Sequence, residues 1–219
     1  MTPDYEAAAL KATETLIKHQ ISAAPVVPMP ILKSMRGVLV LSYEEMARHV
    51  GVDRSNAVLA FGERNQDAST TVSEINGKLC YVVVYNQRLS FYLNQRALAR
   101  ELGHIVLGHD GSRPEAVRQE EALCFARYLL CPRPLLHAIQ EAGICLTNEM
   151  FGNITGCYER CLRDIRKTPG VRIPADLNRQ VLAQFSDYIS DFVAYQSCVA
   201  VEDDSAPADF GSFMDNYEE

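Results

Sequence analysis

Hydrophobic and polar positions repeat with two different periods along this chain, and together they predict a mixed α and β structure. Apolar residues recur near helical spacing from about residue 4 to residue 19, among good helix formers. The β-branched run of residues 38–41 predicts a buried strand, and residues 57–61 are a candidate for another. The three prolines within residues 24–30 favour a connector or a short turn between the helix and the first strand.

The strongest turn signal in the chain is Asn76-Gly77, and the segments that flank it, residues 70–75 and 78–85, are predicted to form a β-hairpin. Asn-Gly supplies the positive φ angles of a type I′ turn. Residues 82–84 are three consecutive valines, so we expect the second strand of the hairpin to be central, with both of its faces covered.

Helix signals surround this β-rich region. Ser42 and Glu45 have the spacing of a capping box, and Gly51 follows the last apolar position, which predicts a short helix over residues 43–50. Towards the C-terminus, breaks at glycine and proline delimit three further predicted helices, over residues 135–141, 147–166 and 175–195.

The most informative stretch runs from residue 96 to residue 131 and predicts two amphipathic helices joined by a loop rich in Gly and Pro. On the first helix, Arg100 and His104 are four residues apart and share a face, with Glu101 beside Arg100. On the second helix, Glu121 lies in the middle of an apolar stripe. A carboxylate in such a place usually has a partner.

Two runs within this stretch, A-R-E-L-G-H-I-V-L-G-H and E-E-A-L-C-F-A-R-Y-L-L-C-P, resemble the ImmA/IrrE family of metallopeptidases. The family pattern is A-H-E-L-G-H…G-H, followed by E-A-x-x-F-A-x-x-L-L-x-P. The resemblance implies a zinc ion held by two histidines on one helix face and a third ligand from a later helix, with the glutamate as general base. It implies that Glu101 is the catalytic glutamate, and that His104 and Glu121 are the second and third zinc ligands.

Arg100 stands where the family has its first zinc-binding histidine. A protonated guanidinium has no lone pair to offer, so Arg100 cannot ligate zinc. Two arrangements remain open from the sequence. Arg100 could take the place of the metal and form a salt bridge with Glu101 or Glu121, or His109 could supply the missing nitrogen. His109 follows Gly108, and we expect it on a different side of the helix from the motif face.

Composition and charge limit the classes of function. The chain has 219 residues, 47% hydrophobic and 22% charged, which is typical of an ordinary soluble globular protein. No apolar run is long enough to span a membrane, and the N-terminus has no export signal, so we expect a cytoplasmic protein with reduced cysteines. The net charge of −7 is concentrated in residues 202–219, which predicts a disordered acidic tail.

The segment from residue 146 to residue 167 resembles the helix-turn-helix-like region that follows the core in this family. Its basic edge is compatible with DNA contact, and equally with a solvated helix face; it consists of Arg160, Arg163, Arg166 and Lys167. Without the acidic tail, the chain carries equal numbers of positive and negative charges, which gives no broad electrostatic surface for nucleic acid.

The sequence therefore predicts an α+β fold, with a small sheet and its hairpin packed against the two motif helices and a helical C-terminal region after them. The predicted division is a metallopeptidase-like core over residues 1–145, a helical region over 146–200 and the tail over 201–219. Our leading hypothesis is an impaired peptidase that acts by binding a protein partner, which is a regulator of a phage or mobile element or a host protein. The alternatives are an active zinc endopeptidase that cleaves a repressor or regulator, and a DNA-binding regulator.

Overall fold

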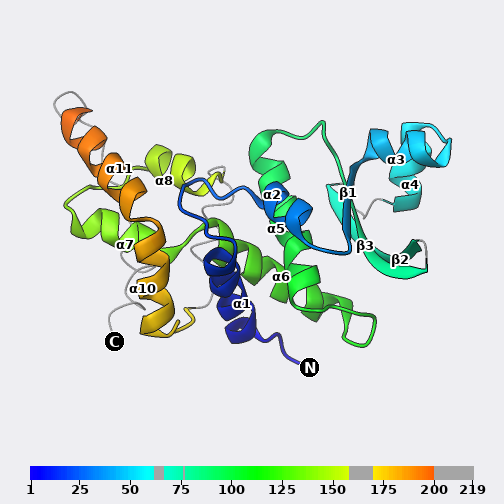
Figure 1. The fold of residues 1–219 in the computed structure, drawn as a ribbon, viewed down its shortest axis with the longest axis horizontal. Helices are drawn as coiled ribbons and strands as arrows, with labels where there is room; N and C mark the ends of the chain where they lie inside the picture. The colour runs from blue at the N-terminus through cyan, green and yellow to red at the C-terminus, as the bar shows by residue number, and fades with distance from the viewer. Residues whose placement is uncertain (62–66, 76, 158–169, 200–219) are drawn as a thin grey trace.

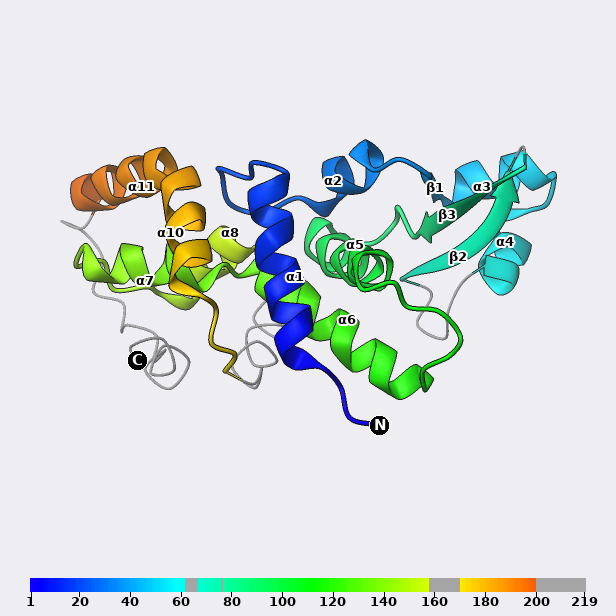
Figure 2. The ribbon, with the colours of Figure 1, turned by 60° about the horizontal axis from the view of Figure 1, so that its bottom comes forward.

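The computed structural model describes residues 1–61, 67–75, 77–157 and 170–199, and it has the predicted α+β architecture (Figure 1). The small sheet lies at one end of an elongated molecule, the C-terminal helices lie at the other, and the two motif helices lie between them (Figures 1 and 2). The elements in chain order are α1 (Tyr5–Lys18), α2 (Pro28–Ser34), β1 (Val38–Ser42), α3 (Tyr43–Val50), α4 (Arg54–Phe61), β2 (Ala68–Ile75), β3 (Lys78–Tyr85), α5 (Phe91–Val106), α6 (Glu115–Leu130), α7 (Arg133–Glu141), α8 (Asn148–Thr155), α10 (Ala175–Gln184) and α11 (Ser186–Val199).

The sheet confirms the predicted hairpin. Its strand order is β1-β3-β2, with β2 antiparallel and β1 parallel to β3. The central place of β3 agrees with its run of valines, which are all buried. Gly77 has the positive φ of 74° that the turn requires, and Asn76 lies outside the described residues.

The two faces of the sheet pack against different cores. Residues that pair across neighbouring strands share a face, and neighbours along one strand point to opposite faces. On β3, Val83 therefore points into the main core, whereas Val82 and Val84 point the other way. On that second face they meet Tyr43 and Met46 of α3 in a separate small cluster, which is entirely apolar.

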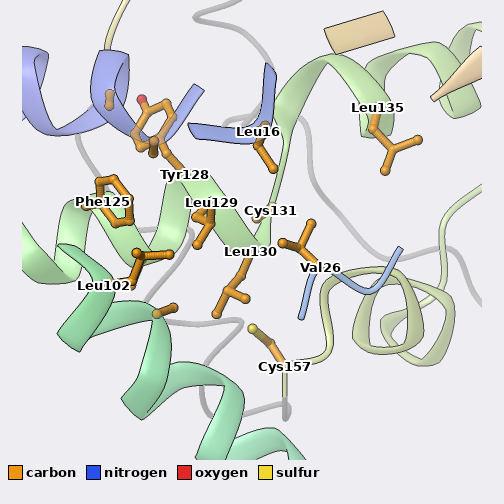
Figure 3. Packing of buried hydrophobic residues seen from close by; sticks show 14 of the residues in the cluster. Leu16, Val26, Leu102, Phe125, Tyr128, Leu129, Leu130, Cys131, Leu135 and Cys157 are labelled. Carbon is orange, nitrogen blue, oxygen red and sulfur yellow. The ribbon is translucent and has the colours of Figure 1, made fainter. Parts of the chain in front are cut away.

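The main core forms where α6 packs against both α1 and α5 (Figure 2). Figure 3 shows Leu16 of α1, Leu102 of α5, Leu129 and Leu130 of α6 and Val26 of the connector converging there. Each of these side chains is at most 2% exposed. Burying one such aliphatic side chain contributes roughly 1.5–3 kcal/mol, so this junction fixes how α5 and α6 face each other.

Helix α3 begins and ends as the sequence predicts. The Ser42 hydroxyl accepts the Glu45 backbone N–H at 3.1 Å, and the Glu45 carboxylate accepts the Ser42 N–H at 2.7 Å. Gly51 follows the helix in the left-handed conformation, with φ of 70°. The reciprocal cap satisfies two N–H groups that have no partner within the helix.

Two predictions for the first half of the chain are wrong. Residues 57–61 belong to helix α4 and not to a strand, because the Asp53 carboxylate accepts the Asn56 N–H at 2.9 Å and starts a helix there. The proline-rich connector contains the short helix α2. Its prolines fall in the first turn, where a missing N–H costs no helical hydrogen bond.

The C-terminal region is helical, with more breaks than predicted. The helix expected over residues 147–166 ends at Thr155, where Gly156 takes a left-handed φ of 62°. The helix expected over residues 175–195 is divided at Phe185 into α10 and α11. The basic edge of residues 160–167 and the acidic tail lie outside the described residues, and the boundary at residue 146 stays a prediction. None of the helices described is both long and apolar enough to cross a bilayer.

Candidate functional site

The site is built where α5 and α6 come into close contact through Gly103. A Cβ atom at Gly103 would lie 3.0 Å from the Phe125 ring and 3.1 Å from the Ala122 carbonyl oxygen, so a larger residue would push the two helices apart. Two polar residues of the same helix, Glu101 and His104, lie within two positions of Gly103 and are buried. A buried polar cluster results, between two apolar helix surfaces.

Arg100 pairs with its neighbour Glu101. The Nη2 and Nε atoms of Arg100 donate to Oε1 of Glu101 at 3.0 and 3.2 Å. The other carboxylate oxygen, Oε2, accepts the hydroxyl of Thr70 on β2 at 2.7 Å. Glu101 is fully buried, so the guanidinium provides the counter-charge that a carboxylate in this environment needs. Of the two predicted partners for Arg100, Glu101 is the one it contacts.

Arg100 also ties α5 to the edge of the sheet. Its Nη2 donates to the backbone carbonyl of Ala68, the first residue of β2, at 3.2 Å. The same side chain thus bridges a helix and a strand 32 residues apart. This is a structural contact that a metal-binding histidine at position 100 is too short to make.

Glu121, on α6, has a separate set of partners. Nη1 of Arg113 donates to both of its carboxylate oxygens, at 2.9 Å to Oε1 and 2.7 Å to Oε2. The Asp4 backbone N–H donates to Oε1 at 2.8 Å, and Nε2 of His109 lies 3.0 Å from Oε2. The sequence predicted that this buried carboxylate would have a partner, and Arg113 fills that role.

His109 lies between His104 and Glu121. Its Nδ1 is 2.8 Å from Nδ1 of His104, and its side chain is only 1% exposed. The expectation that His109 points away from the motif face is therefore wrong. Gly108 takes a left-handed φ of 64° and turns the chain back, so that the His109 N–H still bonds to the His104 carbonyl at 3.0 Å.

The hydrogen bonds assign the protons of the two histidines. A carboxylate only accepts, so Nε2 of His109 donates to Glu121. Glu121 already has the charge of Arg113, and burial lowers the pKa of His109 below its ordinary value, so the ring is neutral and its Nδ1 accepts. His104 must then donate through Nδ1, which leaves its Nε2 as the acceptor nitrogen.

Burial and positive neighbours act together on His104. Burial is the largest cause and, with the titratable ring of His109 and the charges of Arg100 and Arg118, lowers the pKa of His104 to about 4. The imidazole is therefore neutral at pH 7. Its surroundings disfavour any additional positive charge.

A small open pocket of about 120 Å³ borders this cluster. Helix α5 and the following loop contribute Glu101, His104 and His109 to its walls. The β2–β3 hairpin and the first turns of α6 supply the rest of the lining: Thr70, Val72, Tyr81, Glu115, Arg118 and Gln119. A pocket of this size holds a few water molecules or one small side chain.

The residues do not fit a zinc ion in their present arrangement. Zinc requires donors that converge on one point, about 2.0–2.2 Å from each nitrogen or oxygen ligand. Here His109 presents one ring nitrogen to His104 and the other to Glu121, so the three side chains form a chain through the His109 ring. In the described parts of the molecule, no group of three or more His, Cys, Asp or Glu side chains is arranged to hold a metal.

The structure brings all the predicted site residues together, and it adds others that the sequence did not point to. Arg113, Thr70 and the Asp4 backbone N–H donate hydrogen bonds to the two carboxylates, and the Ala68 carbonyl accepts one from Arg100. A signal for His109 was present, because it coincides with the last histidine of the family pattern. Arg113 lies in the irregular loop before α6, where no periodicity predicts the direction of a side chain.

Comparison with known proteins identifies the family of the segment that carries this site. Residues 57–154 match the family described as the IrrE N-terminal-like domain, and the match includes β2, β3 and both motif helices. No curated protein and no solved structure gave a significant match. Through this domain the chain belongs to the ImmA/IrrE family of metallopeptidase-like proteins, which are generally zinc-dependent.

Proposed function

We propose that this chain is an ImmA/IrrE-type protein whose peptidase centre is catalytically impaired and which acts by binding a protein partner. The observation that carries the proposal is the pairing of Arg100 with Glu101 at 3.0 Å. One substitution removes a zinc ligand and gives the general base a permanent counter-charge. We take the class of the partner from the family by analogy. The partner would be a regulator of a phage or mobile element, or a host protein.

The chemistry of Glu101 supports impairment. A general base must accept a proton from a water molecule that is within hydrogen-bond reach. Glu101 is completely buried, Arg100 occupies its Oε1, and Thr70 occupies its Oε2. A base in this state has to break an ion pair before it can act. Position 100 also lacks the histidine that would help to hold a zinc ion, and the zinc ion is what activates the water in this chemistry.

The surface beside the pocket supports partner binding. Val72 and Leu79 lie on the hairpin and are 57% and 76% exposed, among the most exposed large apolar side chains of the described residues. Val72 pairs with Tyr81 and Glu74 pairs with Leu79, which places Val72 and Leu79 on the sheet face that carries the pocket. We propose that an extended segment of the partner covers this face and reaches the pocket with one side chain.

The test is recovery of the tagged full-length chain from its own cells, with and without a chelator in the buffers. We expect a partner of full length that is recovered equally in both conditions and that is lost with Leu79→Glu. Tyr195→Glu is the control, because Tyr195 is equally exposed, at 65%, and lies on α11 at the far end of the molecule (Figure 1). A partner recovered as fragments, intact only with the chelator, would contradict the proposal.

The second candidate function, an active zinc endopeptidase, is favoured by one observation. His109 lies 2.8 Å from His104 and 3.0 Å from Glu121, and two histidines with one carboxylate are a common ligand set for zinc. The His109 ring would have to turn so that a single nitrogen points at the metal. Chelator-sensitive cleavage in the same experiment is the outcome that this candidate predicts.

A further inference from the structure

The carboxylate of Glu121 has no free position for a metal. An ionised carboxylate offers about four lone-pair sites. In this structure it accepts four hydrogen bonds: two from Nη1 of Arg113, one from Nε2 of His109 and one from the Asp4 backbone N–H. A metal ion that binds Glu121 must therefore displace at least one of these donors, whatever residue stands at position 100.

The backbone around Arg113 is fixed by contacts within its own loop and with α6. Its backbone carbonyl accepts the Nε–H of Arg118 at 3.1 Å, and Pro114 fixes the chain immediately before α6. Asp110 and Ser112 bond to each other within the same loop, which makes a local turn. The Arg113 side chain is still 37% exposed, so a substitution there removes the charge without opening a cavity in the core.

We propose that Arg113 is a second barrier to metal binding, independent of Arg100, and that the family's zinc site can be restored in this chain only when both arginines are removed. The inference rests on the proposed function, since it explains how the impaired centre stays metal-free. It assigns Arg113 a positioning role. The guanidinium holds Glu121 in a hydrogen-bonded state and places a permanent positive charge beside the point where a dication would bind.

The experiment measures zinc affinity by competition with a chromophoric chelator for four variants of the full chain: Arg100→His, Arg113→Gln, the two combined, and Arg100→His with Arg96→Gln. The last is the matched control. Arg96 lies one helical turn from position 100 and lines the neighbouring pocket, and it is not among the partners of Glu121. The Arg96→Gln substitution removes one positive charge, as Arg113→Gln does, and it leaves the hydrogen bonds of Glu121 in place.

We expect the Arg100→His/Arg113→Gln variant to bind one zinc at least tenfold more tightly than Arg100→His, as expected for groups that control a metal ligand from outside the coordination shell. The Arg96→Gln control should bind within about threefold of Arg100→His. Equal affinity of Arg100→His and the double variant would overturn the inference, and so would an equal gain from Arg96→Gln.

Folding and the proposed function are tested separately. Circular dichroism of each variant without zinc shows whether it is folded. If the double variant does not fold, Arg113→Met in the Arg100→His background replaces it. Methionine is chosen and not lysine, because a lysine ammonium could repeat the contact that Arg113 makes through one nitrogen. Methionine has a similar length without the charge or the donors, so we expect the same gain in affinity as from Arg113→Gln; an affinity equal to that of Arg100→His overturns the inference. Tight zinc binding by the wild-type chain would contradict the proposed function itself, a different result from every outcome above.

Discussion

Both faces of the sheet pack against hydrophobic clusters, and the face that carries Thr70 also borders buried charged side chains. Behind β3, Val82 and Val84 meet Tyr43 and Met46 in a small cluster made only of apolar residues. On the other face, the sheet covers a cluster in which two buried carboxylates are satisfied by two arginines and a histidine. The first arrangement needs only complementary shapes, whereas the second keeps charges out of water and depends on every partner being present.

The two faces therefore differ in how much their buried side chains contribute to the stability of the fold. Replacing a buried ion pair by apolar residues of similar size is often neutral or stabilising, so a folded protein gains little from Arg100 and Glu101 as a pair. The proposal of an impaired metal site gives this polar cluster a reason other than stability. Four predictions, given from the largest expected effect to the smallest, test this difference between the two faces of the sheet.

Arg100→Ala should destabilise the protein most. It leaves the fully buried Glu101 without its guanidinium and should cost on the order of 3–5 kcal/mol of unfolding free energy, measured by urea denaturation. The combined change Arg100→Met/Glu101→Leu should recover most of that loss, because it removes both charges. If Arg100→Ala unfolds at the same urea concentration as the wild type, Arg100 is not the counter-charge that stabilises the buried Glu101.

Acid should destabilise the polar face next. Burial and nearby positive charges lower the pKa of His104 to about 4, below its ordinary value of 6.5. The unfolded chain therefore binds a proton in the window between 6.5 and 4 that the folded chain does not, so stability falls as pH falls through this window. The loss should be on the order of 3 kcal/mol at pH 4, and the lowered pKa of His109 acts in the same direction.

The measurement is the melting temperature between pH 7 and pH 4.5, for the wild type and for His104→Gln. Glutamine can still donate a hydrogen bond to His109 and does not titrate in this range. We expect a weaker pH dependence in the variant, while Met46→Ala, on the apolar face, should lower the melting temperature and leave the pH dependence unchanged. Parallel curves for the wild type and His104→Gln would contradict the assignment.

Arg113→Gln should cost less than either of these changes, about 1 kcal/mol by urea denaturation. A hydrogen bond to a charged group is worth roughly 1.5–3 kcal/mol, and the 37% exposure of Arg113 lets water replace part of it. Glu121 also keeps His109 and the Asp4 N–H as partners. A loss as large as that of Arg100→Ala would mean that Arg113 is the main counter-charge of the whole cluster.

Leu79→Ser should have the smallest effect on stability. Its side chain is 76% exposed on the hairpin, so the free energy of unfolding should change by no more than about 0.5 kcal/mol. The same substitution should weaken partner binding, which separates a binding surface from a folding requirement. A clear fall in stability would show that Leu79 packs on the body of the protein and would weaken the proposal that it meets a partner.

The sequence predicted those elements that are determined by a few neighbouring residues. The Ser42–Glu45 cap, the hairpin around Gly77 and the central place of β3 follow from a few adjacent residues. The pairing of Arg100 with Glu101 was also within reach, since the two are neighbours on one helix. The strand expected at residues 57–61 is a helix, because the Asp53 cap outweighs a weak β preference.

What the sequence could not predict depends on a change of chain direction. The left-handed Gly108 brings His109 back over the motif face, and the loop that follows aims Arg113 at Glu121 across eight residues. Neither direction is encoded in periodicity, because both arise from irregular backbone between two helices. The N–H of Asp4 reaches Glu121 from 117 residues away, through packing that only the folded chain defines.

The central claim is that this member of the family holds its catalytic centre together without zinc. The most direct measurement is the zinc content of the purified wild-type chain, by elemental analysis after dialysis against a weak chelator. The account predicts much less than one equivalent, because Arg100 offers no ligand to zinc and the His109 ring stands between His104 and Glu121. One equivalent of zinc that survives dialysis would contradict it and would make the endopeptidase the leading function.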